Sequence, residues 1–95
     1  METQTISLEK GEAIGHYINL GKAALLVIQA KKGYVMCGYL NMNAANKYGD
    51  IAGKVTGVKT FDDMLNADVV EVSENAKLAG LKQGINVKDF LNALL

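Results

Sequence analysis

The feature that most constrains the fold is a pair of apolar runs, residues 24–30 and 34–40, separated by a short polar break. The first run is largely apolar on both faces of an extended chain, which indicates a strand covered on both sides. The break, Lys31, Lys32 and Gly33, suits a three-residue hairpin loop in which Gly33 takes a positive φ. It also interrupts the apolar residues, which an amphipathic helix would need at spacings of three and four. The sequence therefore predicts an antiparallel hairpin over residues 24–40.

The segments on either side of this hairpin predict further strands and several short helices. Alternating polarity favours strands over residues 3–9 and 13–20, and extended segments are expected over 50–58 and 69–72. Helices are expected to begin after residues that can cap them, which are Asn41, Thr60, Ser73 and Asn86. The last helix has the clearest apolar stripe, formed by Val87, Phe90, Leu91 and Leu94.

This order of elements predicts an α+β fold. Strands come first and strands alternate with helices later, so we expect an N-terminal antiparallel meander that continues into a mixed sheet with short helices packed on one face. A length of 95 residues fits one compact domain over residues 1–95. So small a domain buries its apolar surface with modest efficiency, which favours a homo-oligomer, with a dimer as the first expectation.

Composition narrows the compartment and the classes of partner. The longest apolar run, residues 23–28, is far shorter than the roughly 20 residues that span a bilayer, so no membrane partner is expected. The first residues do not resemble a signal peptide, and a single cysteine suits a reducing compartment, so a cytoplasmic location is expected. Ten acidic residues balance ten basic residues, and every basic residue is a lysine. Without arginine or a long basic run, nucleic acid is not expected as a partner.

Three segments carry a resemblance to a known family. They are KKGYVMCGYLN (residues 31–41), GDIAGKVTGVKTFDDML (residues 49–65) and VVEVSENAKLAGLKQGI (residues 69–85). Over nearly its whole length the chain resembles the YunC-like family of small prokaryotic proteins, a domain of unknown function. The turn into the last helix departs from the pattern of the relatives, because it has one glycine and an asparagine cap. The resemblance implies a compact α+β fold and supplies no activity.

Cys37 is the sharpest candidate for chemistry. Nucleophilic cysteines are activated by a nearby imidazole, a cation or a helix N-terminus. The chain has one histidine, His16, and a helix is expected to begin a few residues after Cys37. If the strands that carry them approach each other, Cys37 and His16 could form a nucleophile–base pair oriented by Asp50. The alternative is that Cys37 fills the core and that His16 is a hydrogen-bonded structural residue.

Other candidate residues point to ligand binding. Backbone N–H groups near Gly57, with Lys59 and Thr60 at a helix start, could hold a small anion, although an ordinary capped helix explains them as well. Tyr34 and Tyr39 flank the cysteine and suit the rim of a pocket, or equally cross-strand packing. One cysteine and one histidine are too few ligands for a structural zinc site, so no metal is expected.

No cofactor is expected either. The glycines before Lys54 have three residues between them rather than the four of a phosphate-binding P-loop, and Val55 stands where that motif has a hydroxyl residue. The preferred hypothesis is a binding or assembly module with a small-molecule or anion ligand. The alternative is a small cysteine-dependent enzyme that uses Cys37 as nucleophile or redox centre and His16 as base.

Overall fold

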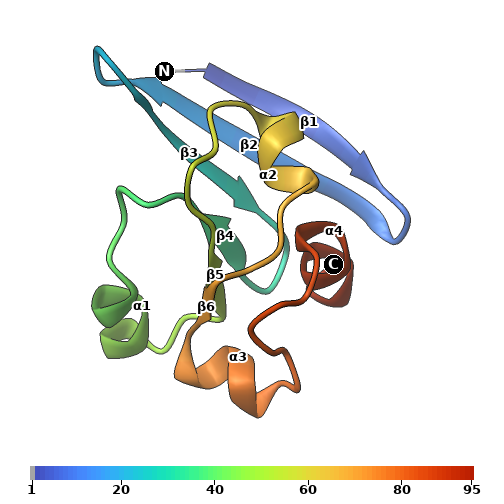
Figure 1. Cartoon of the computed structure of the whole chain (residues 1–95). Helices are drawn as coiled ribbons and strands as arrows, with labels where there is room; N and C mark the ends of the chain where they lie inside the picture. Colours follow the sequence, from blue (N-terminus) through green and yellow to red (C-terminus); the bar gives the residue numbers. More distant parts are fainter. Residues whose placement is uncertain (1) are drawn as a thin grey trace.

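The computed structural model describes residues 2–95, which form six strands and four helices (Figure 1). All six strands belong to one sheet, and their order in the sheet is their order in the chain. The elements are β1 (Glu2–Leu8), β2 (Gly11–Asn19), β3 (Ala24–Gln29), β4 (Tyr34–Met36), α1 (Met42–Tyr48), β5 (Ala52–Lys54), α2 (Phe61–Leu65), β6 (Glu71–Val72), α3 (Glu74–Leu78) and α4 (Val87–Ala93).

The sheet is mixed, as the sequence predicted. Strands β1 to β4 form an antiparallel meander. Strand β5 pairs in parallel with β4, because α1 carries the chain back along the sheet between them, and β6 closes the order antiparallel to β5. None of the helices formed by the described residues is long and apolar enough to cross a membrane.

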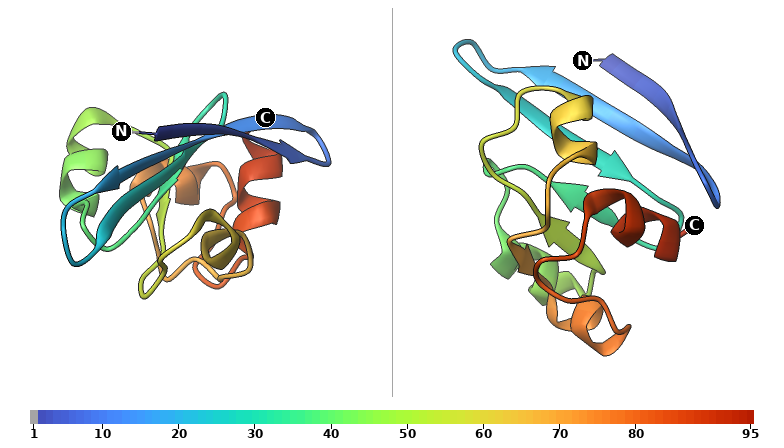
Figure 2. Two further views of the ribbon diagram at one scale, coloured as in Figure 1. Left: turned by 90° about the horizontal axis from the view of Figure 1, so that it is seen from above. Right: turned by 45° about the vertical axis from the view of Figure 1, so that its right-hand side comes forward.

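The hydrophobic core lies on one face of the sheet, here called the core face. Leu26, Ile28 and Val35 point to this face and are completely buried. Helices α2 and α4 cover it, and both lie on the same side of the sheet in Figure 2. The stripe predicted for the last helix is its buried face, and Phe90 and Leu91 are fully enclosed.

The opposite face, here called the outer face, is covered by α1 at one end. Met42 and Ala45 of α1 pack against Met36 of β4 and Ala52 of β5, in a second cluster separate from the main core. The α+β class is thus confirmed, but the expectation that the helices share one face is wrong for α1. A parallel β4–α1–β5 crossover needs a helix on a face of the sheet, and the apolar stripe of α1 takes the outer one. Farther along this face, Ile14 of β2 remains 47% exposed.

The central hairpin forms, with two differences from the prediction. Its second strand ends at Met36 rather than at residue 40, because the N–H of Leu40 turns back to bond the carbonyl of Cys37. Gly33 does not have a positive φ. Glycine is needed there for space, since a Cβ atom on Gly33 would collide with the carbonyl oxygen of Ile51.

Candidate functional site

The structure does not bring the predicted catalytic residues together. The N–H of Cys37 bonds the carbonyl of Leu26, which extends the pairing of β3 with β4 by one residue and places the cysteine on the core face. His16 pairs with Val27, and Val27 pairs with Met36. Residues paired across a sheet point to the same face, so His16 lies on the outer face. The predicted Cys37–His16 pair is therefore wrong, because the sheet separates the two side chains.

Each of these two side chains has its own local partner. Cys37 is 3% exposed, and its Sγ accepts a hydrogen bond of 3.3 Å from the N–H of Leu26. The half-buried ring of His16 has Nε2 3.1 Å from Oε1 of Gln29, on the neighbouring strand. These contacts fit a core thiol and a structural histidine better than a nucleophile and its base.

Asp50, the third predicted catalytic residue, lies instead beside Tyr34 in a polar cleft. The cleft has a volume of about 590 Å³ and lies between the tip of the β3–β4 hairpin, the end of α1 and the end of α3. Its lining includes Lys31, Lys32, Tyr34, Asp50, Asn75 and Leu78.

The hydroxyl of Tyr34 donates a hydrogen bond of 2.7 Å to Oδ2 of Asp50. Burial of the phenol, followed by the hydrogen bond to Asp50 and the negative charge of Asp50, raises the pKa of Tyr34 to about 12. The phenol is therefore neutral at physiological pH and serves as a hydrogen-bond donor. A neutral phenol beside a carboxylate is suited to orienting a ligand.

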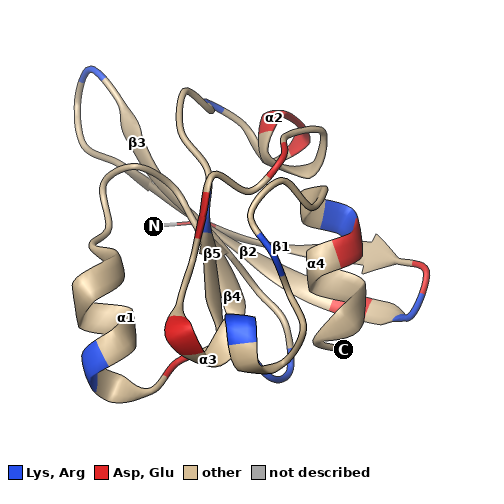
Figure 3. Cartoon of the chain, turned by 60° about the horizontal axis from the view of Figure 1, so that its bottom comes forward, with Lys and Arg blue, Asp and Glu red and all other residues tan. Residues whose placement is uncertain are grey.

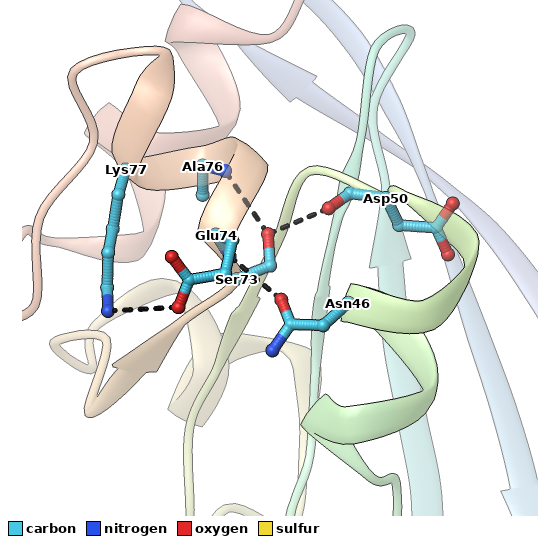
Figure 4. A network of polar contacts seen from close by, with 6 residues as sticks. All are labelled: Asn46, Asp50, Ser73, Glu74, Ala76 and Lys77. Atoms are coloured by element: carbon cyan, nitrogen blue, oxygen red, sulfur yellow. Dashed lines mark hydrogen bonds and ion pairs between the residues drawn. The ribbon is translucent and has the colours of Figure 1, made fainter.

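The backbone around Asp50 is fixed by the fully buried side chain of Ser73, at the start of α3 (Figure 4). The Ser73 hydroxyl donates to the carbonyl oxygen of Asp50 at 2.7 Å. The Ser73 hydroxyl oxygen in turn accepts from the N–H of Ala52 at 3.0 Å and from the N–H of Ala76 at 3.2 Å, so it also caps the helix. One hydroxyl thus joins β5, α3 and the cleft wall.

Two further contacts hold the helices around the cleft. The side-chain oxygen of Asn46 in α1 accepts from the N–H of Glu74 at 2.8 Å (Figure 4). The amide nitrogen of Asn75 donates to the carbonyl of Gly49 at 2.6 Å. Gly49 ends α1 in the left-handed conformation, with a φ of 74°, and so turns the chain toward Asp50. The cleft is therefore built before any ligand enters it.

The charge at the cleft mouth comes from the hairpin tip. Lys31 and Lys32 are exposed and separate two strands, β3 and β4, that carry no charged residue (Figure 3). Among residues 2–95 the one ion pair joins Lys77 to Glu74, so neither hairpin lysine is neutralised by a direct salt bridge. Two lysines against the single carboxylate of Asp50 leave the lining positive. The α3 side contributes the side chain of Leu78, which is 84% exposed.

A second and smaller pocket brings together three other predicted residues. Cys37, Tyr39 and Gly57 all line a space of about 320 Å³. Tyr39 is 55% exposed, as expected of a rim residue, while Cys37 shows only its edge to the pocket. This pocket contains no charged residue.

Lys59 and Thr60 line neither pocket, and the backbone N–H of Lys59 and the hydroxyl of Thr60 form hydrogen bonds at the start of α2. The Thr60 hydroxyl accepts from the N–H of Asp63 at 3.0 Å, and the Asp63 carboxylate accepts from the N–H of Lys59 at 3.0 Å. The adjacent Asp62 adds a second negative charge to the first turn. Carboxylates already occupy the position where an anion would sit, so the structure gives little support to anion binding there.

Sequence reasoning missed part of the cleft. It treated Lys31 and Lys32 as a turn and Ser73 as a helix cap, and both descriptions are correct but incomplete. The signal that could have found them is the parallel pairing of β4 with β5, which aligns the hairpin tip with the segment before β5. Within residues 2–95 no group of three or more His, Cys, Asp or Glu side chains is placed to hold a metal ion.

Comparisons with known proteins place these features in a family. A family model described as a domain of unknown function, DUF1805, matches residues 36–94. The uncharacterized protein YunC from Bacillus subtilis (strain 168) is 31% identical over 78 residues, which cover 78% of this chain and 77% of YunC. The crystal structure of TA1206, a protein of unknown function from Thermoplasma acidophilum, aligns with a TM-score of 0.93 at 44% identity, over 99% of this chain and 92% of that one.

Proposed function

The chain belongs to the DUF1805 family, whose function is unknown, and we propose that it is a binding module that holds a small anionic molecule in the cleft between the β3–β4 hairpin tip and α3. In this proposal residues 1–95 act as one domain in the cytoplasm, where the free thiol of Cys37 stays reduced. The observation that carries the proposal is the Tyr34–Asp50 pair, set in a cleft whose mouth has two unpaired lysines.

Size and charge support a small anionic ligand. A volume of about 590 Å³ lies within the range of roughly 300–1,000 Å³ that small-molecule sites occupy. The ammonium groups of Lys31 and Lys32 would attract a carboxylate or phosphate as point charges. Asp50 already accepts from Tyr34, and its remaining lone pairs would accept from a hydroxyl or amine of the same ligand.

The chemistry of the cleft supports binding rather than turnover. With a pKa of about 12, the phenol of Tyr34 is a poor proton acceptor near neutral pH. The side chain that donates to the Asp50 carboxylate is this phenol, and not a serine, threonine or cysteine that could act as a nucleophile. The Ser73 hydroxyl is occupied by three backbone groups and is buried behind the wall of the cleft.

The proposal is tested by calorimetry and by NMR titration with inorganic phosphate, citrate and adenosine monophosphate as probes. We expect at least one probe to bind and to shift the amide signals of Gly33 and Asp50. The double variant Lys31→Gln/Lys32→Gln should weaken that binding by about tenfold, which corresponds to about 1.4 kcal/mol. The matched control is Lys82→Gln/Lys88→Gln, which removes the same charge outside the cleft and should leave the affinity nearly unchanged.

A result against the proposal would be equal weakening by the two double variants, because that would indicate general charge attraction. Shifts clustered around Tyr39 and Gly57 would instead move the site to the second pocket. That pocket favours one other candidate function, a small cysteine-dependent enzyme with Cys37 as nucleophile or redox centre. It is the weaker candidate, because the cysteine sulfur is buried and His16 lies on the other face of the sheet.

A further inference from the structure

We propose that the free edge of β1 is a self-association surface, and that a second copy of this chain pairs with it antiparallel across a two-fold axis at Thr5. This edge is separated by β2 from β3 and from the hairpin tip that lines the cleft, so the self-association does not depend on the proposed ligand. It would join the two sheets into one continuous sheet. Each subunit would keep its own cleft.

The edge is long and unprotected. Strand β1 has seven residues, pairs only with β2 among the described strands, and has exposed side chains at four consecutive positions from Glu2 to Thr5. Proteins usually protect such an edge with lysine, proline, a bulge or a covering element. Strand β1 has neither lysine nor proline, its one charged residue, Glu2, lies at its first position, and its pairing with β2 runs without a bulge from Glu2 to Leu8. The unpaired N–H and C=O groups of such an edge are a template for pairing with a further strand.

The register with β2 shows which backbone groups are free. Leu8 and Gly11 flank a two-residue turn and form the pair that closes the hairpin, so hydrogen-bonded pairs alternate outward from them. Thr3, Thr5 and Ser7 then have their N–H and C=O groups directed away from β2. These groups form an evenly spaced row that a second antiparallel strand can satisfy.

A two-fold axis at Thr5 gives the longest overlap and the best side-chain pairing. It places Thr5 opposite Thr5 of the second copy, and Thr3 opposite Ser7, on the outer face. Cross-strand pairs of threonine and serine are favourable in antiparallel sheets. On the core face Glu2 meets Leu8 and Gln4 meets Ile6, so the one charged residue of the strand meets no like charge. The strand is thus complementary to itself, which a symmetric dimer requires.

The competing site for a second copy is the uncovered part of the outer face. Ile14 is 47% exposed there, and its neighbour His16 is half-buried. Pairing through this face would leave the backbone row of β1 unsatisfied. The edge and the face are separated by experiment, because Thr5 and Ile14 can be changed one at a time.

The experiment uses light scattering and disulfide cross-linking. We expect a solution mass twice the 10.2 kDa of one chain. Thr5→Cys should form a disulfide-linked dimer under mild oxidation, because directly paired residues have Cα atoms about 5.5 Å apart, within the range of a disulfide. Gln4→Cys is the matched control: residue 4 is also exposed and is adjacent to residue 5, but the axis places its two copies out of reach of a disulfide. The buried Cys37 should not cross-link in the unchanged protein.

Two further variants complete the test. Thr5→Pro removes an N–H that points away from β2, so it should give a folded monomer, verified by an unchanged NMR pattern for the core. Ile14→Lys should leave the dimer intact. A monomeric protein, equal cross-linking of Thr5→Cys and Gln4→Cys, or a dimer broken by Ile14→Lys would each overturn the proposal. If Thr5→Pro fails to fold, the comparison of Thr5→Cys with Gln4→Cys still tests whether the two copies pair at Thr5.

Discussion

Tyr34 and Asp50 are 16 residues apart in the chain, and their side chains meet through a hydrogen bond of 2.7 Å. The parallel pairing of β4 with β5 produces this contact. Tyr34, the first residue of β4, lies opposite Ala52. Asp50, two positions before Ala52, therefore lies beside the start of β4, where the phenol is. A helix, α1, and its left-handed glycine at residue 49 return the chain to this point. The pair is therefore a product of the crossover and not of local sequence.

The first prediction concerns Tyr34→Phe and its dependence on pH. The variant loses a hydrogen bond to a charged group at a half-buried site, so we expect a loss of about 1 kcal/mol in the free energy of unfolding at pH 7. The pKa of Tyr34 is raised in the folded state to about 12 from 10.0. The folded state binds this proton more tightly than the unfolded state, so the stability of the wild-type protein should fall as the pH rises from about 10 to about 12.

Denaturant titrations of both proteins across this range check the prediction. The difference in stability between the wild-type protein and Tyr34→Phe should shrink toward high pH, because only the wild-type protein loses the contribution of this phenol. A difference that stays constant from pH 7 to pH 12 would contradict the role given to Tyr34. The other tyrosines are the same in both proteins and cancel in the comparison.

The second prediction concerns Ser73→Ala. The change removes three hydrogen bonds at a fully buried site and leaves the N–H groups of Ala52 and Ala76 without a partner. We expect a destabilisation of about 2–3 kcal/mol, from the lost cap and from the unsatisfied donors. Thr60→Ala is the matched control, because it removes one exposed helix cap and should lose about 1 kcal/mol. Equal losses in chemical denaturation would show that Ser73 is only a cap.

The third prediction concerns Gly33→Ala at the hairpin tip. The added methyl group collides with the backbone carbonyl of Ile51, which cannot move without disturbing the hydrogen bond from the N–H of Tyr34. A loss of about 1–3 kcal/mol in stability is expected, as for other overpacked sites. Gly38→Ala is the control, since its Cβ atom would meet only a methyl carbon of Thr56 at 3.7 Å. Thermal melts of the two variants should therefore differ clearly.

The fourth prediction concerns the reactivity of Cys37. Its sulfur is 3% exposed and accepts an N–H group, so iodoacetamide should modify it far more slowly in the native protein than in denaturant. Mass spectrometry over time measures both rates. The variant Lys82→Cys provides an exposed thiol in the same chain as an internal reference, away from both the cleft and β1. If Cys37 in the folded protein reacted as fast as that reference, the cysteine-dependent enzyme would become the leading candidate function.

Much of the fold could be predicted because its signals are local. All four predicted caps, Asn41, Thr60, Ser73 and Asn86, accept a hydrogen bond from the first turn of their helices. The apolar stripe of α4 could be recognised because four residues at helical spacing are enough to define a buried face. The alternation in the first forty residues gave the meander for the same reason.

The site was less predictable because its geometry depends on pairing across strands. Whether His16 and Cys37 share a face is decided by register through β3, and the sequence does not specify that register. Tyr34 and Asp50 were both singled out, yet for separate roles, because nothing local indicates that they touch. Tyr48 shows the same limit: it follows the buried Met42 and Ala45 at helical spacing, yet it is 75% exposed where α1 ends.

The strand order has a consequence for how the molecule forms. Each strand pairs with the one that precedes it in the chain, so a growing polypeptide can add strands one after another to an existing edge during synthesis. The helix α4 arrives after all of them, and it supplies the side chain of Phe90, which packs against Gly53 of β5 and is completely enclosed. Until it docks, the nascent sheet exposes its apolar surface. This step is where assistance from a chaperone would matter most.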